Sequence, residues 1–187
     1  MRKLNKLLVL IAILSFLSAS VVLADTKFED MKHSLEEQTK MYNDRLSVLY
    51  IDAKQVGDML IGYSAILEFV ISDYDLAENL ANFTSLPQWY YDASFSFANI
   101  DMNRDLCFVC HVTFSRVWNF DPLKIKIGDY QLQENDIVSP SASNPFGEFP
   151  SDTDGYFVFR VPRKVIKGKK NIDISYENYK VTWTVIK

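Results

Sequence analysis

Cysteine and histidine are scarce in this sequence, and their scarcity limits the chemistry it can support. Only two cysteines and two histidines occur among 187 residues. The sequence therefore has few residues from which to build a multi-histidine metal site or a Ser-His-Asp triad. The sequence also lacks a glycine-rich phosphate loop, an H-E-x-x-H zinc motif and a G-x-S-x-G nucleophile elbow. We therefore predict a protein that is not an enzyme.

Basic residues are absent from one long stretch and concentrated in another. No lysine or arginine occurs between Gln55 and Asn103, which argues against phosphate contacts to nucleic acid or anionic lipid there. Residues 25–92 contain 13 acidic and five basic residues, whereas residues 160–187 contain eight basic and two acidic ones. The basic C-terminal segment could bind such a phosphate surface, or could equally face the acidic half of its own chain or of a neighbour. We expect no nucleic-acid partner.

A long apolar run occurs only at the N-terminus. Basic residues at positions 2, 3 and 6 precede the apolar stretch Leu7–Leu17, and Ala24 follows as a small residue suited to signal peptidase. We interpret residues 1–24 as a signal peptide and Asp25 as the mature N-terminus. The protein is then periplasmic, on the cell surface or secreted. An uncleaved anchor is the alternative, because residues 7–24 are nearly long enough to span a bilayer, and only then do we expect membrane attachment.

Residues 25–87 show a helical period. Thr26 and Glu29 fit a capping box. Apolar and aromatic residues then recur every seven positions over five to six heptads, with a second series offset by three or four positions, as in the a and d positions of a coiled coil. The first series is Leu35, Tyr42, Leu49, Val56, Tyr63 and Val70, and the second is Thr39, Leu46, Ala53, Leu60, Leu67 and Tyr74.

Two helical arrangements fit this heptad pattern. A single long helix would associate with copies of itself, whereas a helical hairpin would close the seam internally or against the second half of the chain. Gly57 and Gly62 weaken a continuous helix, and Ser72 with Asp75 could cap a second one. Self-association or binding to another exported protein is the partner prediction that follows.

After Pro87 the period changes from helical to alternating. Apolar and polar residues alternate over several short stretches separated by Pro, Gly, Asn and Asp residues, a pattern typical of an antiparallel β-sandwich. We therefore predict an α+β protein with an immunoglobulin-like β-sandwich over residues 88–187. The alternating stretches are 94–97, 106–114, 124–127, 156–161, 172–176 and 181–186.

One motif points to a cofactor. Cys107 and Cys110 with His111 form the C-x-x-C-H signature of covalent haem attachment in c-type cytochromes. Haem would make the protein a monohaem electron carrier. Residues 106–114 read as one β-strand, however, and residues three apart on a strand point to opposite faces. We therefore favour two strand cysteines and no cofactor, and keep covalent haem as the alternative.

Two further groups of residues are candidates for partner binding. Trp89, Tyr90 and Tyr91 could stack on a sugar, as in a carbohydrate-binding module, or could seal the junction between helices and sheet. The basic run could bind an anionic glycan, a cell-surface polymer or an acidic subunit. Its five bases are Arg163, Lys164, Lys167, Lys169 and Lys170. The sequence thus favours an exported, non-enzymatic structural, assembly or binding protein.

Overall fold

The computed structural model describes residues 36–78, 86–140 and 145–185, apart from the side chains of Gln55 and Leu60. The chain divides into two compact units, residues 1–40 and residues 41–187. Residues 36–43 are helical. The predicted signal peptide over residues 1–24 and the capping box at Thr26 lie outside the described residues.

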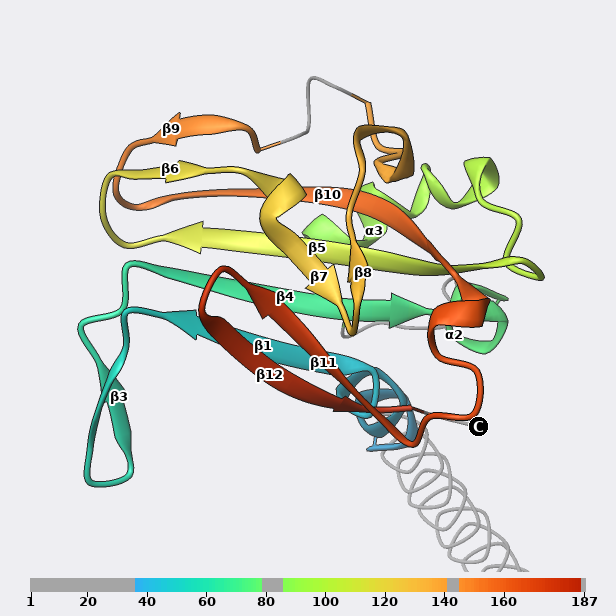
Figure 1. Ribbon diagram of the computed structural model, residues 1–187, viewed down its shortest axis with the longest axis horizontal. Coiled ribbons are helices and arrows are strands. Elements are labelled where there is room, and N and C mark those ends of the chain that lie inside the picture. The colour runs from blue at the N-terminus through green and yellow to red at the C-terminus, as the bar shows by residue number, and fades with distance from the viewer. Residues whose placement is uncertain (1–35, 79–85, 141–144, 186–187) are drawn as a thin grey trace, which may run out of the picture. The chain divides into compact units, whose positions relative to one another are not determined.

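The second unit is built mainly from antiparallel β-sheets. One four-stranded sheet has the strand order β1-β4-β5-β10, and every neighbouring pair in it is antiparallel. Its strands, the long central elements of Figure 1, are β1 (Leu46–Ile51), β4 (Ala65–Ser72), β5 (Asp105–Phe114) and β10 (Thr153–Pro162). A second sheet has the order β12-β11-β7-β8. Its strands are β7 (Ile125–Ile127), β8 (Tyr130–Gln131), β11 (Asn171–Tyr176) and β12 (Tyr179–Thr184).

Two small ribbons and several short helices complete the described part of this unit. The ribbons are β2 (Lys54–Val56) with β3 (Met59–Ile61), and β6 (Trp118–Phe120) with β9 (Gly147–Phe149). The α-helices are α2 (Tyr74–Glu78) and α3 (Gln88–Ser94). The 3₁₀ helices are η2 (Phe97–Asn99), η3 (Pro122–Lys124), η4 (Glu134–Asp136) and η6 (Arg163–Val165).

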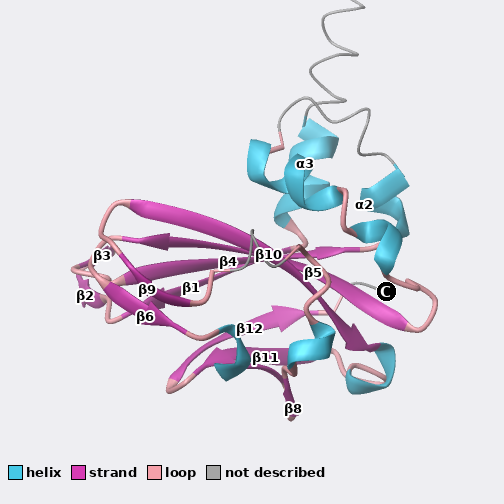
Figure 2. Cartoon of the chain, turned by 90° about the horizontal axis from the view of Figure 1, so that it is seen from above, coloured by secondary structure: helices cyan, strands magenta, loops and turns pink. Residues whose placement is uncertain are grey.

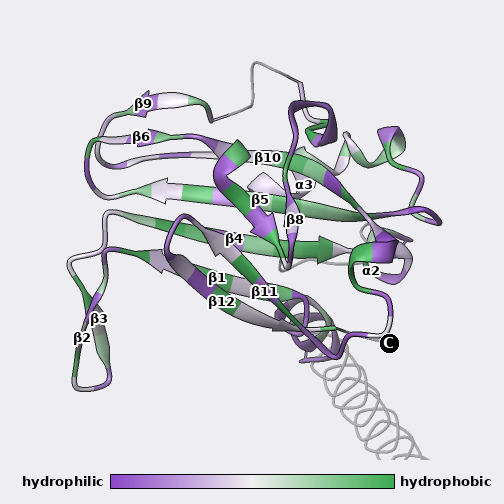
Figure 3. Cartoon of the chain, in the orientation of Figure 1, coloured by the Kyte–Doolittle hydropathy of each residue, from purple (hydrophilic) through white to green (hydrophobic). Residues whose placement is uncertain are grey.

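The main hydrophobic core lies between the two four-stranded sheets. It joins side chains such as Phe108 and Phe159 of the first sheet to Ile174 and Trp183 of the second. Phe108 stacks on Phe159 and meets Trp183 edge to face. Burying these large apolar surfaces is the main favourable contribution to folding. Figure 3 shows hydrophobic stretches along β4 and β5, the two central strands of the first sheet.

A second core covers the opposite face of the first sheet. Val70, Cys107, Val109 and Val158 point away from the main core and are fully buried. The elements that cover them are α2, α3 and η2, so the first sheet lies between helices on one side and the second sheet on the other (Figure 2). Because both faces of β4 and β5 are buried, both strands are apolar at most positions.

The prediction of a long helix or helical hairpin over the first half of the chain is wrong for residues 46–72. These residues form β1, β2, β3 and β4 instead. A strand buried on both faces is apolar at consecutive positions. Some of these apolar residues are then seven positions apart by chance, and they imitate the heptad pattern of a coiled coil. Gly57 takes a positive φ of 61° at the turn of the β2–β3 hairpin, a conformation that suits glycine in a tight hairpin.

The predicted strands after Pro87 are confirmed in position with one exception. β5, β7, β10, β11 and β12 overlap the stretches that alternate in the sequence. Residues 94–97 are not a strand, because Ser94 ends α3 and Phe97 begins η2. Phe97 is buried in the second core, whereas Phe95 is 84% exposed, so the two phenylalanines do not share one face.

Candidate functional site

The five bases predicted as a binding run line one groove. After β10 ends at Pro162, the chain turns through η6 and a short loop before β11 begins at Asn171. This segment forms most of an open groove of about 570 Å³, within the size range of ligand-binding pockets in proteins. Its lining residues are Arg163, Lys164, Ile166, Lys167, Gly168, Lys169, Lys170 and Val185. The groove therefore combines basic side chains with two apolar ones.

Backbone hydrogen bonds hold the groove in shape. The amide of Arg163 donates to the carbonyl of Arg104 at 2.9 Å, and the amide of Val185 donates to the carbonyl of Lys170 at 2.8 Å. The guanidinium Nε of Arg163 also donates to the carbonyl of Met102 at 2.7 Å. The groove is thus tied to β12 on one side and to the start of β5 on the other, and Arg163 has a structural role besides its charge.

The charge of the groove is not neutralised within the described part of the chain. None of its five bases makes an ion pair there, whereas two other lysines do. Lys124 pairs with Glu177 at 2.6 Å, and Lys180 pairs with Asp173 at 3.2 Å. Closely spaced like charges raise the local potential and attract an ion of opposite sign. The groove is therefore suited to an anionic ligand.

A second polar cluster lies on the helix-covered side of the first sheet. His111 of β5 contacts the Glu68 carboxylate through Nδ1 at 2.8 Å and the Asp154 carboxylate through Nε2 at 3.0 Å. Pairing of the strands explains the arrangement. Glu68 of β4 lies directly opposite His111, and Asp154 of β10 is two residues from Tyr156, the other direct partner of His111. We call these three side chains the histidine bridge.

Trp89 of α3 covers the imidazole of the histidine bridge. The two rings stack with their centroids 4.7 Å apart and their planes 4° from parallel. Burial lowers the pKa of His111, but hydrogen bonds to Glu68 and Asp154 and the charges of these carboxylates raise it further than burial lowers it. The net effect is a pKa above the ordinary value of 6.5, so the ring favours the imidazolium form, which donates from both nitrogens.

The histidine bridge is suited to holding a proton rather than a metal. Its ring nitrogens face two different carboxylates on opposite sides, so the three side chains do not converge on one point. Within the part of the chain that the structure describes, no group of three or more His, Cys, Asp or Glu residues is arranged to hold a metal ion. An imidazolium bonded at both nitrogens also has no lone pair with which to accept a substrate proton.

The two cysteines lie on opposite faces of β5. Cys107 is buried in the second core, and Cys110 is buried in the main core between the sheets. Burial raises the pKa of both thiols, which keeps them protonated and unreactive. Two thiols on opposite faces cannot both reach the edge of one porphyrin, so the C-x-x-C-H residues do not fit covalent haem in this fold. His111, the proposed iron ligand, is occupied by the histidine bridge.

The three consecutive aromatic residues are not presented on one surface. Tyr90 is fully buried, and its hydroxyl donates to Ser72 at 2.9 Å. Trp89 is half-buried against His111, and Tyr91 is half-buried within the helical layer. Of the two alternatives given above, packing between helices and sheet therefore applies to Tyr90. The structure does not assemble the three rings into a flat platform.

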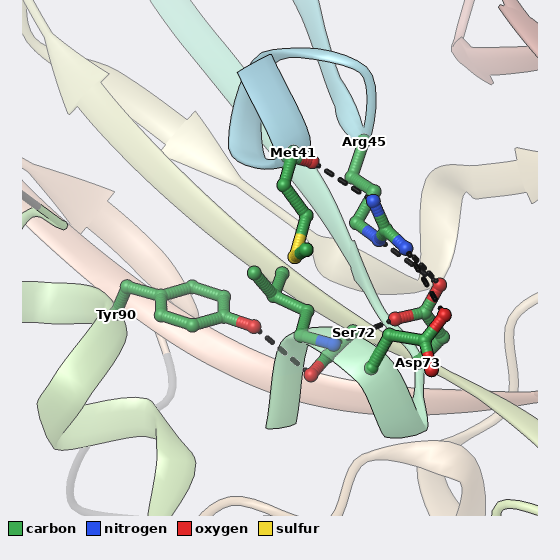
Figure 4. A network of polar contacts seen from close by, with 7 residues as sticks. Met41, Arg45, Ser72, Asp73 and Tyr90 are labelled. Carbon is green, nitrogen blue, oxygen red and sulfur yellow. Dashed lines mark hydrogen bonds and ion pairs between the residues drawn. The ribbon is translucent and has the colours of Figure 1, made fainter. Parts of the chain in front are cut away.

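A network beside Tyr90 anchors the start of β1 to the end of β4 (Figure 4). The guanidinium of the buried Arg45 donates to the Asp73 carboxylate from Nη2 at 2.6 Å and from Nε at 2.9 Å, and to the Met41 carbonyl at 3.0 Å. The other oxygen of Asp73 accepts from the amide of Leu76 at 2.9 Å, which satisfies a free donor in the first turn of α2. This network is structural, because its hydrogen bonds join the residue before β1, the end of β4, α2 and α3 to one another.

Sequence reasoning finds the groove but not the histidine bridge. The groove bases are close together in the sequence, whereas Glu68 and Asp154 each lie 43 residues from His111. Only the pairing of β4, β5 and β10 brings the three side chains together.

No family model matches the chain, and neither curated proteins nor solved structures give a significant match. Among the described residues, no helix is both long enough and apolar enough to cross a membrane.

Proposed function

We propose that this protein is an exported, non-enzymatic binding protein that holds an anionic polymer in the groove of residues 163–170. The observation that carries the proposal is the convergence of five basic side chains on one groove, with no ion pair to any of them within the described part of the chain. Export, inferred from residues 1–24, makes an anionic glycan or a cell-surface polymer the partner, rather than nucleic acid.

The composition of the groove supports a polymer over a single small anion. Lys164, Lys167 and the pair Lys169-Lys170 spread their charges along a turn and the loop that follows it, which suits several anionic groups in sequence. Ile166 and Val185 add apolar surface that can pack against a sugar ring or a linking chain. Lysine side chains bury their aliphatic stems in such a contact and keep their charge at the ligand.

The two sheets supply the scaffold in this proposal. We propose that they act as an immunoglobulin-like β-sandwich does, as a rigid support that presents a binding surface at its edge, although the strand orders β1-β4-β5-β10 and β12-β11-β7-β8 are the chain's own. The self-association predicted from the heptad seam is not part of the proposal, because residues 46–72 form strands.

A binding titration tests the proposed function. The purified protein is titrated against a labelled heparin oligosaccharide of defined length, which serves as a linear polyanion probe. Replacing Lys164, Lys167 and Lys169 by Gln is expected to weaken binding by at least about tenfold. The matched control replaces Lys124, Lys126 and Lys180 by Gln, which removes the same net charge from the second sheet and from η3, the helix that precedes β7.

The control separates a site from a general charge effect. We expect it to change the affinity by less than about twofold, because Lys124 and Lys180 are already paired with acids. Equal losses in the two variants would show attraction to net charge alone and would contradict a site at the groove. The absence of any measurable binding by the unaltered protein would contradict the proposed function.

A further inference from the structure

The helix α3 covers a buried thiol, and packing against the first sheet together with the hydrogen bond from Tyr90 to Ser72 holds it in place. Tyr90 and Ala93 of α3 are buried in the second core together with Cys107. The helix has seven residues, too few to be stable in water on its own. Its position therefore depends on contacts with the face of the first sheet (Figure 2).

The histidine bridge lies where α3 meets the sheet. Trp89, in the first turn of α3, stacks on His111, which is itself fixed between Glu68 and Asp154. We infer that the protonated imidazole of His111 is a latch that holds α3 closed over Cys107. A cation under the face of an indole is attracted by the ring, and this attraction requires the proton.

Burial and two carboxylates determine how His111 responds to pH, and two tyrosines lie beside this cluster. Glu68 on β4 and Asp154 on β10 face its two nitrogens. Tyr156 is its direct partner on β10, and Tyr42 lies near enough to Glu68 that burial together with the carboxylate charge raises the pKa of Tyr42. On α3, the carboxylate of Asp92 accepts from Gln88 at the exposed surface instead of facing the bridge.

Loss of the proton from His111 weakens three contacts at once. A neutral imidazole donates one hydrogen bond, so one carboxylate then faces a ring nitrogen that is itself an acceptor. The two carboxylates also lose the positive charge between them, and Trp89 loses the cation beneath it. Asp154 is largely exposed and turns to water, so the imidazole on which Trp89 stacks is held by fewer contacts.

When α3 moves away from the sheet, the thiol of Cys107 becomes exposed. Burial under α3 raises the pKa of Cys107, so the closed helix keeps this thiol protonated and out of reach. Cys110 points into the main core between the sheets and is not covered by α3. Movement of α3 away from the sheet would therefore expose Cys107 and leave Cys110 buried. The reactivity of Cys107 alone then reports the opening of the latch.

Thiol alkylation tests the latch. In the full chain carrying Cys110→Ser, the rate of Cys107 alkylation by iodoacetamide is measured at several values between about pH 5.5 and pH 8.5. The same measurement is made after adding His111→Gln, which removes the titration, and the two rates are divided at each pH so that the ionisation of the thiol cancels. We expect the ratio to be about one tenth at low pH and to approach one as His111 loses its proton.

Further variants keep the test decisive. Glu68→Gln removes one arm of the bridge and should give the same loss of protection, so it replaces His111→Gln if that variant does not fold. Asp92→Asn is the matched control on α3 and should leave the ratio unchanged, because Asp92 does not face the bridge. Cys110, measured in a Cys107→Ser chain, should stay unreactive throughout. A ratio that does not change with pH, or parallel exposure of Cys110, would overturn the latch.

Discussion

The indole of Trp89 lies flat against the imidazole of His111, and the ring carries a carboxylate at each nitrogen. This arrangement links a short helix to three adjacent strands through one titratable group. The contacts to Glu68 and Asp154 require the imidazolium form to be fully satisfied. Conformational stability should therefore depend on the proton of His111.

The first prediction is the pH dependence of that stability. The pKa of His111 is raised in the folded chain above its ordinary value of 6.5. The folded state therefore binds the proton more tightly than the unfolded state, and its contribution is complete below pH 6.5 and is lost as pH rises through the raised pKa. We expect urea unfolding to show a loss of about 1 kcal/mol over this range.

The His111→Gln variant is the control for this loss, which should be absent from it. Nuclear magnetic resonance can follow the ring directly, because His33 is the only other histidine and His33→Gln identifies the signal. A His111 titration at or below 6.5 would contradict the raised pKa. A wild-type unfolding curve that responds to pH as the variant does would contradict its effect on stability.

The second prediction concerns the anchor between Arg45 and Asp73. Arg45→Ala removes a buried guanidinium, so the carbonyl of Met41 and one oxygen of the Asp73 carboxylate lose their donor. Breaking such a pair from one side is expected to lower the free energy of unfolding by about 3 kcal/mol. The matched control is Lys180→Ala, which breaks an exposed pair with Asp173 and should cost less than about 1 kcal/mol. Equal costs in urea unfolding would show that the anchor is not a special contact.

The second half of the fold could be predicted from the sequence because apolar and polar residues alternate in most of its strands. β11 and β12 each have one face toward the core and one toward solvent, so apolar and polar residues alternate and the strands stand out. The first half could not be predicted in this way. β4 is buried by the second sheet on one face and by helices on the other, and its residues Phe69, Val70 and Ile71 are all apolar.

A local signal for the first half was nevertheless present. Gly57-Asp58, between two short apolar stretches, is a pair typical of a two-residue hairpin turn, and it marks the β2–β3 ribbon. The heptad reading treated Gly57 only as a weak point in a helix. The histidine bridge had no comparable signal, because its members are brought together by strand pairing across 43 residues in each direction.

The third prediction concerns the N-terminus. If residues 1–24 are a signal peptide, the exported protein begins at Asp25, which N-terminal sequencing or intact mass measurement can check. Ala24→Leu should block cleavage, because signal peptidase requires a small residue at that position. A mature protein that retains residues 1–24 would show that the segment is an anchor.

The fourth prediction concerns haem. Because Cys107 and Cys110 lie on opposite faces of β5, we expect no covalent haem when the protein is produced together with a cytochrome c maturation system. A haem-stained denaturing gel measures this directly. A stained band that is lost in Cys107→Ser would contradict the packing of β5 described above.

Binding of a linear polyanion in the basic groove should depend strongly on salt, because each lysine that contacts the polymer releases a counterion. Binding of a heparin oligosaccharide is measured over a series of salt concentrations, and the slope of log Kd against log salt gives the number of counterions released. Replacing Lys164, Lys167 and Lys169 by Gln should reduce that slope by about one for each lysine that contacts the polymer, whereas replacing Lys124, Lys126 and Lys180 should leave it nearly unchanged. A slope that falls equally in both variants, or in neither, would contradict the groove as the binding site.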